Sequence, residues 1–99
     1  MFYNLINTKN GHNKFYIISA YAYTDKETGK DNNIYVSLQW GRIGTSGQAQ
    51  HKEFKSRREA INFALEKLKE KLNKGYEIKE TKELREIADI PKANETIIG

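Results

Sequence analysis

Residues 34–48 read Ile-Tyr-Val-Ser-Leu-Gln-Trp-Gly-Arg-Ile-Gly-Thr-Ser-Gly-Gln, and this stretch decides the fold. Apolar and polar side chains alternate from Ile34 to Trp40, a period that predicts a strand with one buried face. Three glycines in the seven residues after Trp40 predict a tight turn with an exposed backbone. Residues 50–54 then predict a short returning strand.

Two further strands are expected upstream of this stretch. Residues 2–6 predict a first strand, and the Asn10-Gly11 pair predicts the turn that ends it, because both residues tolerate positive φ. Residues 14–23 are rich in aromatic and β-branched side chains on both faces. A strand of that composition is expected at the centre of a sheet, with cover on both sides.

The best-marked element is a helix over residues 56–74. Ser56 and Glu59 form a capping box at its start, and Gly75 supplies a left-handed stop. An apolar stripe at helical spacing predicts the side that packs on the sheet. It comprises Ile61, Ala64, Leu65, Leu68 and Leu72.

The fold class that follows is α+β: an antiparallel sheet packed against one long helix, with a short helical tail at the C-terminus. Within the tail we expect two helical turns over residues 82–88, ended by Pro91, and a last short strand or a frayed end at residues 96–98. We expect one domain over residues 1–78 and a C-terminal extension over residues 79–99.

Composition narrows the class of protein. The 99 residues fit one domain, and zero cysteines exclude a disulfide scaffold, a zinc ribbon and a thiol nucleophile. We find no run of 18 apolar residues and no signal-peptide pattern, and we expect no membrane partner. A cytoplasmic location is therefore the simplest expectation, with association with a bacterial nucleoid as an alternative.

Positive charge is concentrated in the body of the chain. Residues 1–75 hold 13 Lys or Arg against 7 Asp or Glu, a net of +6, whereas residues 76–99 hold 4 against 6, a net of −2. A basic body of this kind suits phosphates, because neutralising them releases counterions. The alternative is that the lysines only keep a small protein soluble.

No catalytic pattern is present in the sequence. His12 and His51 lack metal-ligand spacing, so we expect no metal site and no cofactor. The glycine-rich stretch after Trp40 matches neither a P-loop nor a dinucleotide fingerprint, and Ser46 is not in a nucleophile elbow. An enzyme with a small-molecule substrate is therefore the least supported class.

The segment 35–48 resembles the signature of the WGR domain, a module of poly(ADP-ribose) polymerases that also occurs in bacterial proteins. The resemblance extends over residues 2–78. Its further matches are Asn13-Lys14-Phe15-Tyr16 at a strand start, Phe54, Ser56, Glu59-Ala60 and Phe63 at the helix start, and Lys71 with Lys74-Gly75-Tyr76 at the helix end.

The resemblance implies a non-catalytic module that binds DNA ends, nicks or gaps without sequence preference. It makes Trp40 a stacking platform for a terminal nucleotide and Arg42 a phosphate or interdomain contact. It also implies that Gly41, Gly44 and Gly47 let the backbone approach the ligand, next to Gln48 in the same signature. Independently of the family, the residues themselves suggest further phosphate contacts, which are Lys14, Lys52, Lys55, Arg57 and Arg58.

Each of these residues also has a structural explanation. Strand alternation places Trp40 on the core face, so burial and exposure are equally expected. Arg42 can pair with a carboxylate, Arg57 and Arg58 can be ordinary surface residues, and a tight turn suffices to explain the glycines. The alternative function is a protein-interaction module that docks a partner or effector domain through the same surface.

Overall fold

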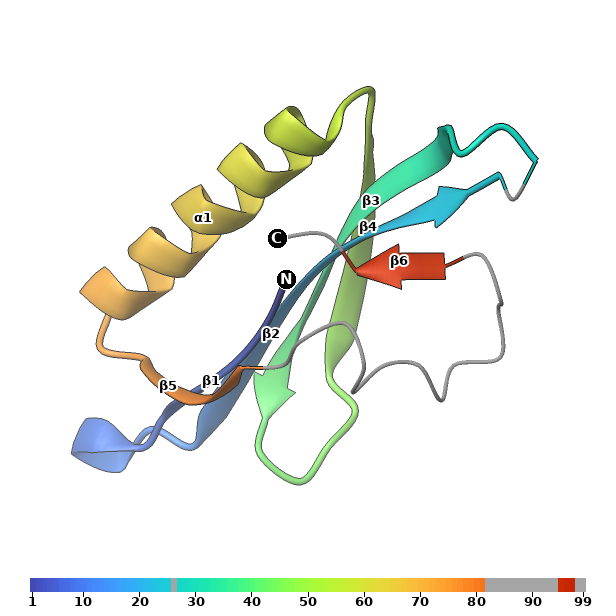
Figure 1. Ribbon diagram of the computed structural model, residues 1–99. Helices are drawn as coiled ribbons and strands as arrows, with labels where there is room; N and C mark the ends of the chain where they lie inside the picture. The colour runs from blue at the N-terminus through green and yellow to red at the C-terminus, as the bar shows by residue number, and fades with distance from the viewer. Residues whose placement is uncertain (26, 82–94, 98–99) are drawn as a thin grey trace.

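The structure is a computed structural model that describes residues 1–25, 27–81 and 95–97. Figure 1 shows a twisted sheet with a single long helix lying across one face. The strands are β1 (Phe2–Asn7), β2 (Lys14–Thr24), β3 (Asp31–Arg42), β4 (Gln48–Phe54), β5 (Glu77–Thr81) and β6 (Glu95–Ile97). A 3₁₀ turn, η1 (Lys9–Gly11), joins β1 to β2, and the helix α1 (Arg57–Asn73) follows β4.

The sheet is antiparallel throughout, with the strand order β4-β3-β2-β1-β5. β6 pairs with β2 at residues 21–23, beyond the stretch of β2 that pairs with β1. The central position expected for residues 14–23 is confirmed, because β2 has partners on both of its edges. The cover expected on both faces is wrong for the described residues: α1 lies over one face, and the side chains of Phe15, Ile17, Tyr21 and Tyr23 on the other are only half-buried. The α+β class is likewise confirmed.

The core lies between α1 and the sheet face that it covers. Cross-strand register brings Ile18 opposite Leu38 and Ala20 opposite Val36, and these four side chains are buried. Ala60 and Ala64 on the helix are fully buried above them. Short alanine side chains let the helix axis come close to the sheet, so the branched strand residues fill the space beneath it.

The helix begins and ends as its sequence predicts. Ser56 is the N-cap, and its side-chain oxygen accepts a hydrogen bond of 3.2 Å from the backbone N–H of Glu59. Gly75 follows the C-cap with a φ of 98°, in the left-handed region that glycine adopts without strain.

The predicted apolar stripe of the helix is partly wrong. Leu65 and Leu72 are 42% and 40% exposed, whereas Ala60, outside the stripe, is fully buried. The helix is rotated so that its smallest side chains face the sheet. Packing distance, which periodicity does not report, decides that rotation.

The chain after the helix returns to the sheet. β5 pairs with β1, and it crosses the position between residues 78 and 79 where a domain boundary is predicted; that boundary stays a prediction. The strand expected at residues 96–98 is present as β6 over Glu95–Ile97, with residue 98 outside the described part. The helical turns expected over residues 82–88 also lie outside it. Among the described residues, no helix is long and apolar enough to cross a membrane.

Candidate nucleic-acid interface

Trp40 lies near the end of β3, on the sheet face that α1 covers. It is half-buried and stands opposite Tyr16 of β2, with ring centroids 5.9 Å apart and the rings inclined by 21°. Tyr16 is buried, and its other ring contact is edge-to-face with Tyr76, just beyond the helix, at 6.2 Å. One face of the indole therefore packs against the core residue Tyr16, and part of the side chain remains accessible to solvent.

The helix places a cation over this aromatic cluster. The Lys71 ammonium nitrogen lies 4.5 Å from the centroid of the Tyr16 ring. Burial lowers the pKa of Lys71, and the nearby charges of Lys74, Lys67 and Lys14 lower it further, against an opposing effect of Glu70. An anion at this end of the molecule would stabilise the charged form of Lys71, since it would offset the repulsion between the lysines.

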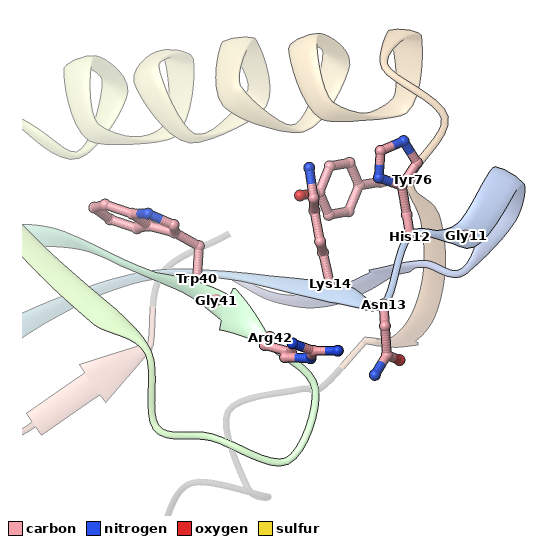
Figure 2. Close-up of a pocket in the computed structure, with 8 residues that line it drawn as sticks. All are labelled: Gly11, His12, Asn13, Lys14, Trp40, Gly41, Arg42 and Tyr76. Atoms are coloured by element: carbon pink, nitrogen blue, oxygen red, sulfur yellow. The ribbon is translucent and has the colours of Figure 1, made fainter.

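A hollow of about 530 Å³ opens at the end of the sheet beside Trp40. Its lining comes from the η1 turn, the start of β2, the end of β3 and the residue after the helix: Gly11, His12, Asn13, Lys14, Trp40, Gly41, Arg42 and Tyr76. Figure 2 shows the Lys14 side chain rising toward the helix, the Trp40 indole beneath the helix and directed away from Lys14, and Arg42 at the level of the sheet. Lys14 and Arg42 are directly opposite in the register of β2 and β3, and both are exposed.

The turn after Arg42 packs on the backbone of Trp40. Thr45 donates to the Arg42 carbonyl through both its backbone N–H (3.0 Å) and its hydroxyl (2.7 Å). A Cβ on Gly47, whose φ is 67°, would lie 2.0 Å from the Trp40 carbonyl oxygen, and one on Gly41 would lie 2.7 Å from the Cα of Gly47. The turn itself thus requires glycine at 41 and 47, whereas Gly44 faces open space with a φ of 94°.

The structure brings together only part of the predicted interface. Lys14, Trp40, Gly41 and Arg42 line the hollow. Gln48 stands opposite Trp40 on β4, and the turn holds Gly44 and Gly47. These residues form one end of the molecule.

The remaining candidates lie elsewhere along the helix. Lys52 is on β4, opposite Val36 and beneath α1, with its ammonium 4.8 Å from the Phe63 ring. Lys55, Arg57 and Arg58 precede or begin α1, whose C-terminal end is the one beside Trp40. A helix of 17 residues is about 25 Å long, so these three are remote from the hollow.

Arg57 has a partner within the protein. Its Nε and Nη2 atoms donate to the two carboxylate oxygens of Asp31, at 2.5 and 2.8 Å. The hydrogen bonds from Arg57 lower the pKa of Asp31, and they raise that of Arg57. The anion that offsets an arginine at the helix N-terminus is thus a carboxylate of the chain itself.

Several residues at the hollow were not predicted as contacts. His12 and Asn13 lie there because they follow the Asn-Gly turn directly, and Tyr76 because it follows the helix stop. Tyr76 is half-buried and packs against the core as well as lining the hollow. The signal that could have found it is the match of Lys74-Gly75-Tyr76 to the family's helix end. In the described residues no three His, Cys, Asp or Glu side chains are grouped as metal ligands.

Comparison with known proteins decides the family. The family model of the WGR domain matches residues 1–83. The chain belongs to the WGR domain family. WGR domains are known as non-catalytic, nucleic-acid-binding modules.

A solved structure has a similar fold. A protein of Bacteroides fragilis, known from its crystal structure, is 28% identical to this WGR chain and superposes with a TM-score of 0.61 over 93% of it. The WGR chain spans 22% of the length of that protein. No curated protein matches the chain.

Proposed function

We propose that this WGR domain binds DNA at ends, nicks or gaps, without sequence preference and without catalysing a reaction. The observation that supports the proposal is the hollow, which is lined by the aromatic residues Trp40 and Tyr76 together with the exposed cations Lys14 and Arg42. Aromatic and cationic side chains in one concave site suit a ligand that has both a stacking surface and phosphates.

A break offers what an intact duplex hides. The last base pair at an end exposes an aromatic face and its sugar, and stacking on an aromatic side chain is worth roughly 1–3 kcal/mol per base. The hollow, at about 530 Å³, falls within the range of roughly 300–1,000 Å³ typical of sites for small organic groups. A terminal nucleotide therefore suits this site.

The lack of sequence preference follows from the kind of groups present. Lys14 and Arg42 would contact phosphates, which are the same for every sequence. An aromatic ring accepts any base, because every base has a π-face. Neither contact distinguishes one base pair from another.

The test is fluorescence anisotropy with three duplexes: nicked, blunt-ended, and a dumbbell closed by a hairpin at each end. We expect the nicked and blunt duplexes to bind more tightly than the dumbbell, and Arg42→Gln and Trp40→Ala to weaken that binding. Arg58→Gln is the matched control for Arg42→Gln, since it removes the same charge at the other end of α1. Equal affinity for all three duplexes would contradict the break preference.

A docking site for a partner protein is the second candidate. Ile43, next to Arg42 at the turn, is 38% exposed. It lines a second hollow together with the apolar side chains of Ile6, Phe15 and Ile17, a grouping that suits a protein partner. Absence of binding to any duplex at low salt, with circular dichroism showing a folded protein, would favour this function over DNA binding.

A further inference from the structure

A second arrangement of cations and rings lies away from the hollow, between β4 and α1. The Lys52 ammonium is 4.8 Å from the centroid of Phe63 and 5.6 Å from that of Phe54, and these two rings are 5.3 Å apart. The Lys67 ammonium approaches the same Phe63 ring at 5.8 Å. We call Lys52, Phe54, Phe63 and Lys67 the lysine–phenylalanine strip.

The strip leads toward Trp40 along both the helix and the strand. On α1, Phe63, Lys67 and Lys71 follow one another at intervals of four residues, each about 6 Å further along, and Lys71 sits over the Tyr16 ring that stacks on Trp40. On β4, the side chains that alternate back from Lys52 are Gln50 and Gln48, and Gln48 stands opposite Trp40. Both rows therefore connect the strip with the hollow.

The strip is accessible and positively charged. Lys52 is exposed, while Phe54, Phe63 and Lys67 are half-buried, so each ring contributes to the surface as well as to the core. The Glu70 carboxylate accepts hydrogen bonds of 3.4 Å from both Lys67 and Lys74. Among the described residues Lys52 and Lys71 form no ion pair with a carboxylate, so their ammonium charges remain available along the path.

We propose that the lysine–phenylalanine strip binds the unpaired nucleotides of a single-stranded extension at a DNA break, with Trp40 at the junction with the duplex. The inference rests on the proposed function of the hollow and adds the class of break. Unpaired bases have free faces that can take the place of the Lys52 and Lys67 ammonium groups over the phenylalanine rings, and the phosphates between the bases can receive the displaced ammonium groups. A duplex would offer only its phosphates.

The length of the path sets the length of the extension. From Gln48 to Lys52 the strand advances four residues, about 14 Å. Stacked nucleotides advance about 3.4 Å each along one strand. An extension of about four nucleotides therefore spans the path, and further nucleotides add nothing specific.

The experiment compares hairpin duplexes whose single open end is either blunt or carries four unpaired thymidines, in separate 3′ and 5′ versions. Anisotropy titrations at low salt should show the extended end of one polarity bound about tenfold more tightly than the blunt end, the scale of one stacked base. The double variant Lys52→Gln, Lys67→Gln should lose this gain while keeping its affinity for the blunt end. Lys55→Gln with Lys69→Gln is the matched control, with both residues exposed and outside the strip.

The outcomes separate this inference from the function on which it rests. Blunt-end binding with no gain from an extension of either polarity would overturn the inference and leave the proposed function standing. A gain that persists in the Lys52→Gln, Lys67→Gln variant would also overturn it, since the extension would then lie elsewhere. No binding to any open end by the folded protein would overturn the proposed function, and this inference with it.

Discussion

The single residue Trp40 both packs against the core and contributes to the surface of the candidate site. Strand alternation predicts burial, and the family resemblance implies contact with a ligand; the ring stacks on Tyr16 and also lines the hollow. Both roles are compatible because the indole lies beneath α1 near the end of β3, half-buried, and still lines the hollow (Figure 2). The sequence does not decide between burial and exposure, because alternation reports which face of a strand a side chain lies on and not how much of that side chain its neighbours cover.

The glycines after Trp40 give a prediction at the same scale. Gly47→Ala should destabilise the domain by about 3 kcal/mol or more, because the new Cβ meets the Trp40 carbonyl oxygen and the backbone is left-handed. Gly44→Ala has a similar backbone but open space around it, and should cost only about 1 kcal/mol. Urea unfolding of both variants measures the difference, and equal losses would contradict the steric argument.

At the scale of elements, α1 could be predicted from its sequence in extent but not in all its contacts. The Ser56 cap and the Gly75 stop lie where local rules expect them, because both depend on neighbours within four residues. The Arg57–Asp31 pair joins the helix to the start of β3 across 26 residues, so no local pattern indicates it. The prediction of Arg57 as a phosphate contact therefore could not take this carboxylate partner into account.

The Arg57–Asp31 pair should make stability depend on pH. The pKa of Asp31 is lowered in the folded protein, so the pair stabilises the fold above the unfolded value of 3.8, and this contribution is lost as pH falls through the lowered folded value. Asp31→Asn should therefore be less stable than the wild type at pH 7, by on the order of 1 kcal/mol or less for a partly exposed pair, with the gap narrowing near pH 3.

Urea unfolding at both pH values measures this gap. Glu66→Gln is the control, because Glu66 is an exposed helix residue. A gap between Asp31→Asn and the wild type that stays constant from pH 7 to pH 3 would show that the carboxylate charge contributes nothing.

For the whole molecule, the class of fold followed from the order of strands and helix, but the composition of the site did not. The site depends on the return of the chain after α1, where β5 pairs with β1 and Tyr76 comes to lie against Tyr16. That pairing joins residues more than 70 positions apart, beyond the reach of periodicity. For the same reason the sequence does not show that the predicted phosphate contacts lie apart, with α1 separating Arg58 from Arg42.

The salt dependence of DNA binding tests whether Arg42 and Arg58, at the two ends of α1, contribute differently to the interface. The logarithm of the DNA affinity should fall linearly with the logarithm of salt concentration, with a slope of about −0.9 per phosphate neutralised. Arg42→Gln should make that slope shallower by about one, because one phosphate contact is lost. Arg58→Gln should leave the slope unchanged, and a change of equal size in both variants would indicate a diffuse electrostatic attraction instead of a site beside Trp40.

The packing of Gly47 on the carbonyl of Trp40 has a consequence for how the family's sequences diverge. Steric fit within the turn constrains positions 41 and 47 to glycine. The exposed side chain of Arg42 is constrained only by the ligand or partner that binds this surface. Descendants that abandon the ancestral ligand should therefore retain both glycines and let the arginine drift. Among relatives, we expect glycines at positions 41 and 47 wherever the fold is kept. We expect arginine at position 42 only where the surface still binds its ligand.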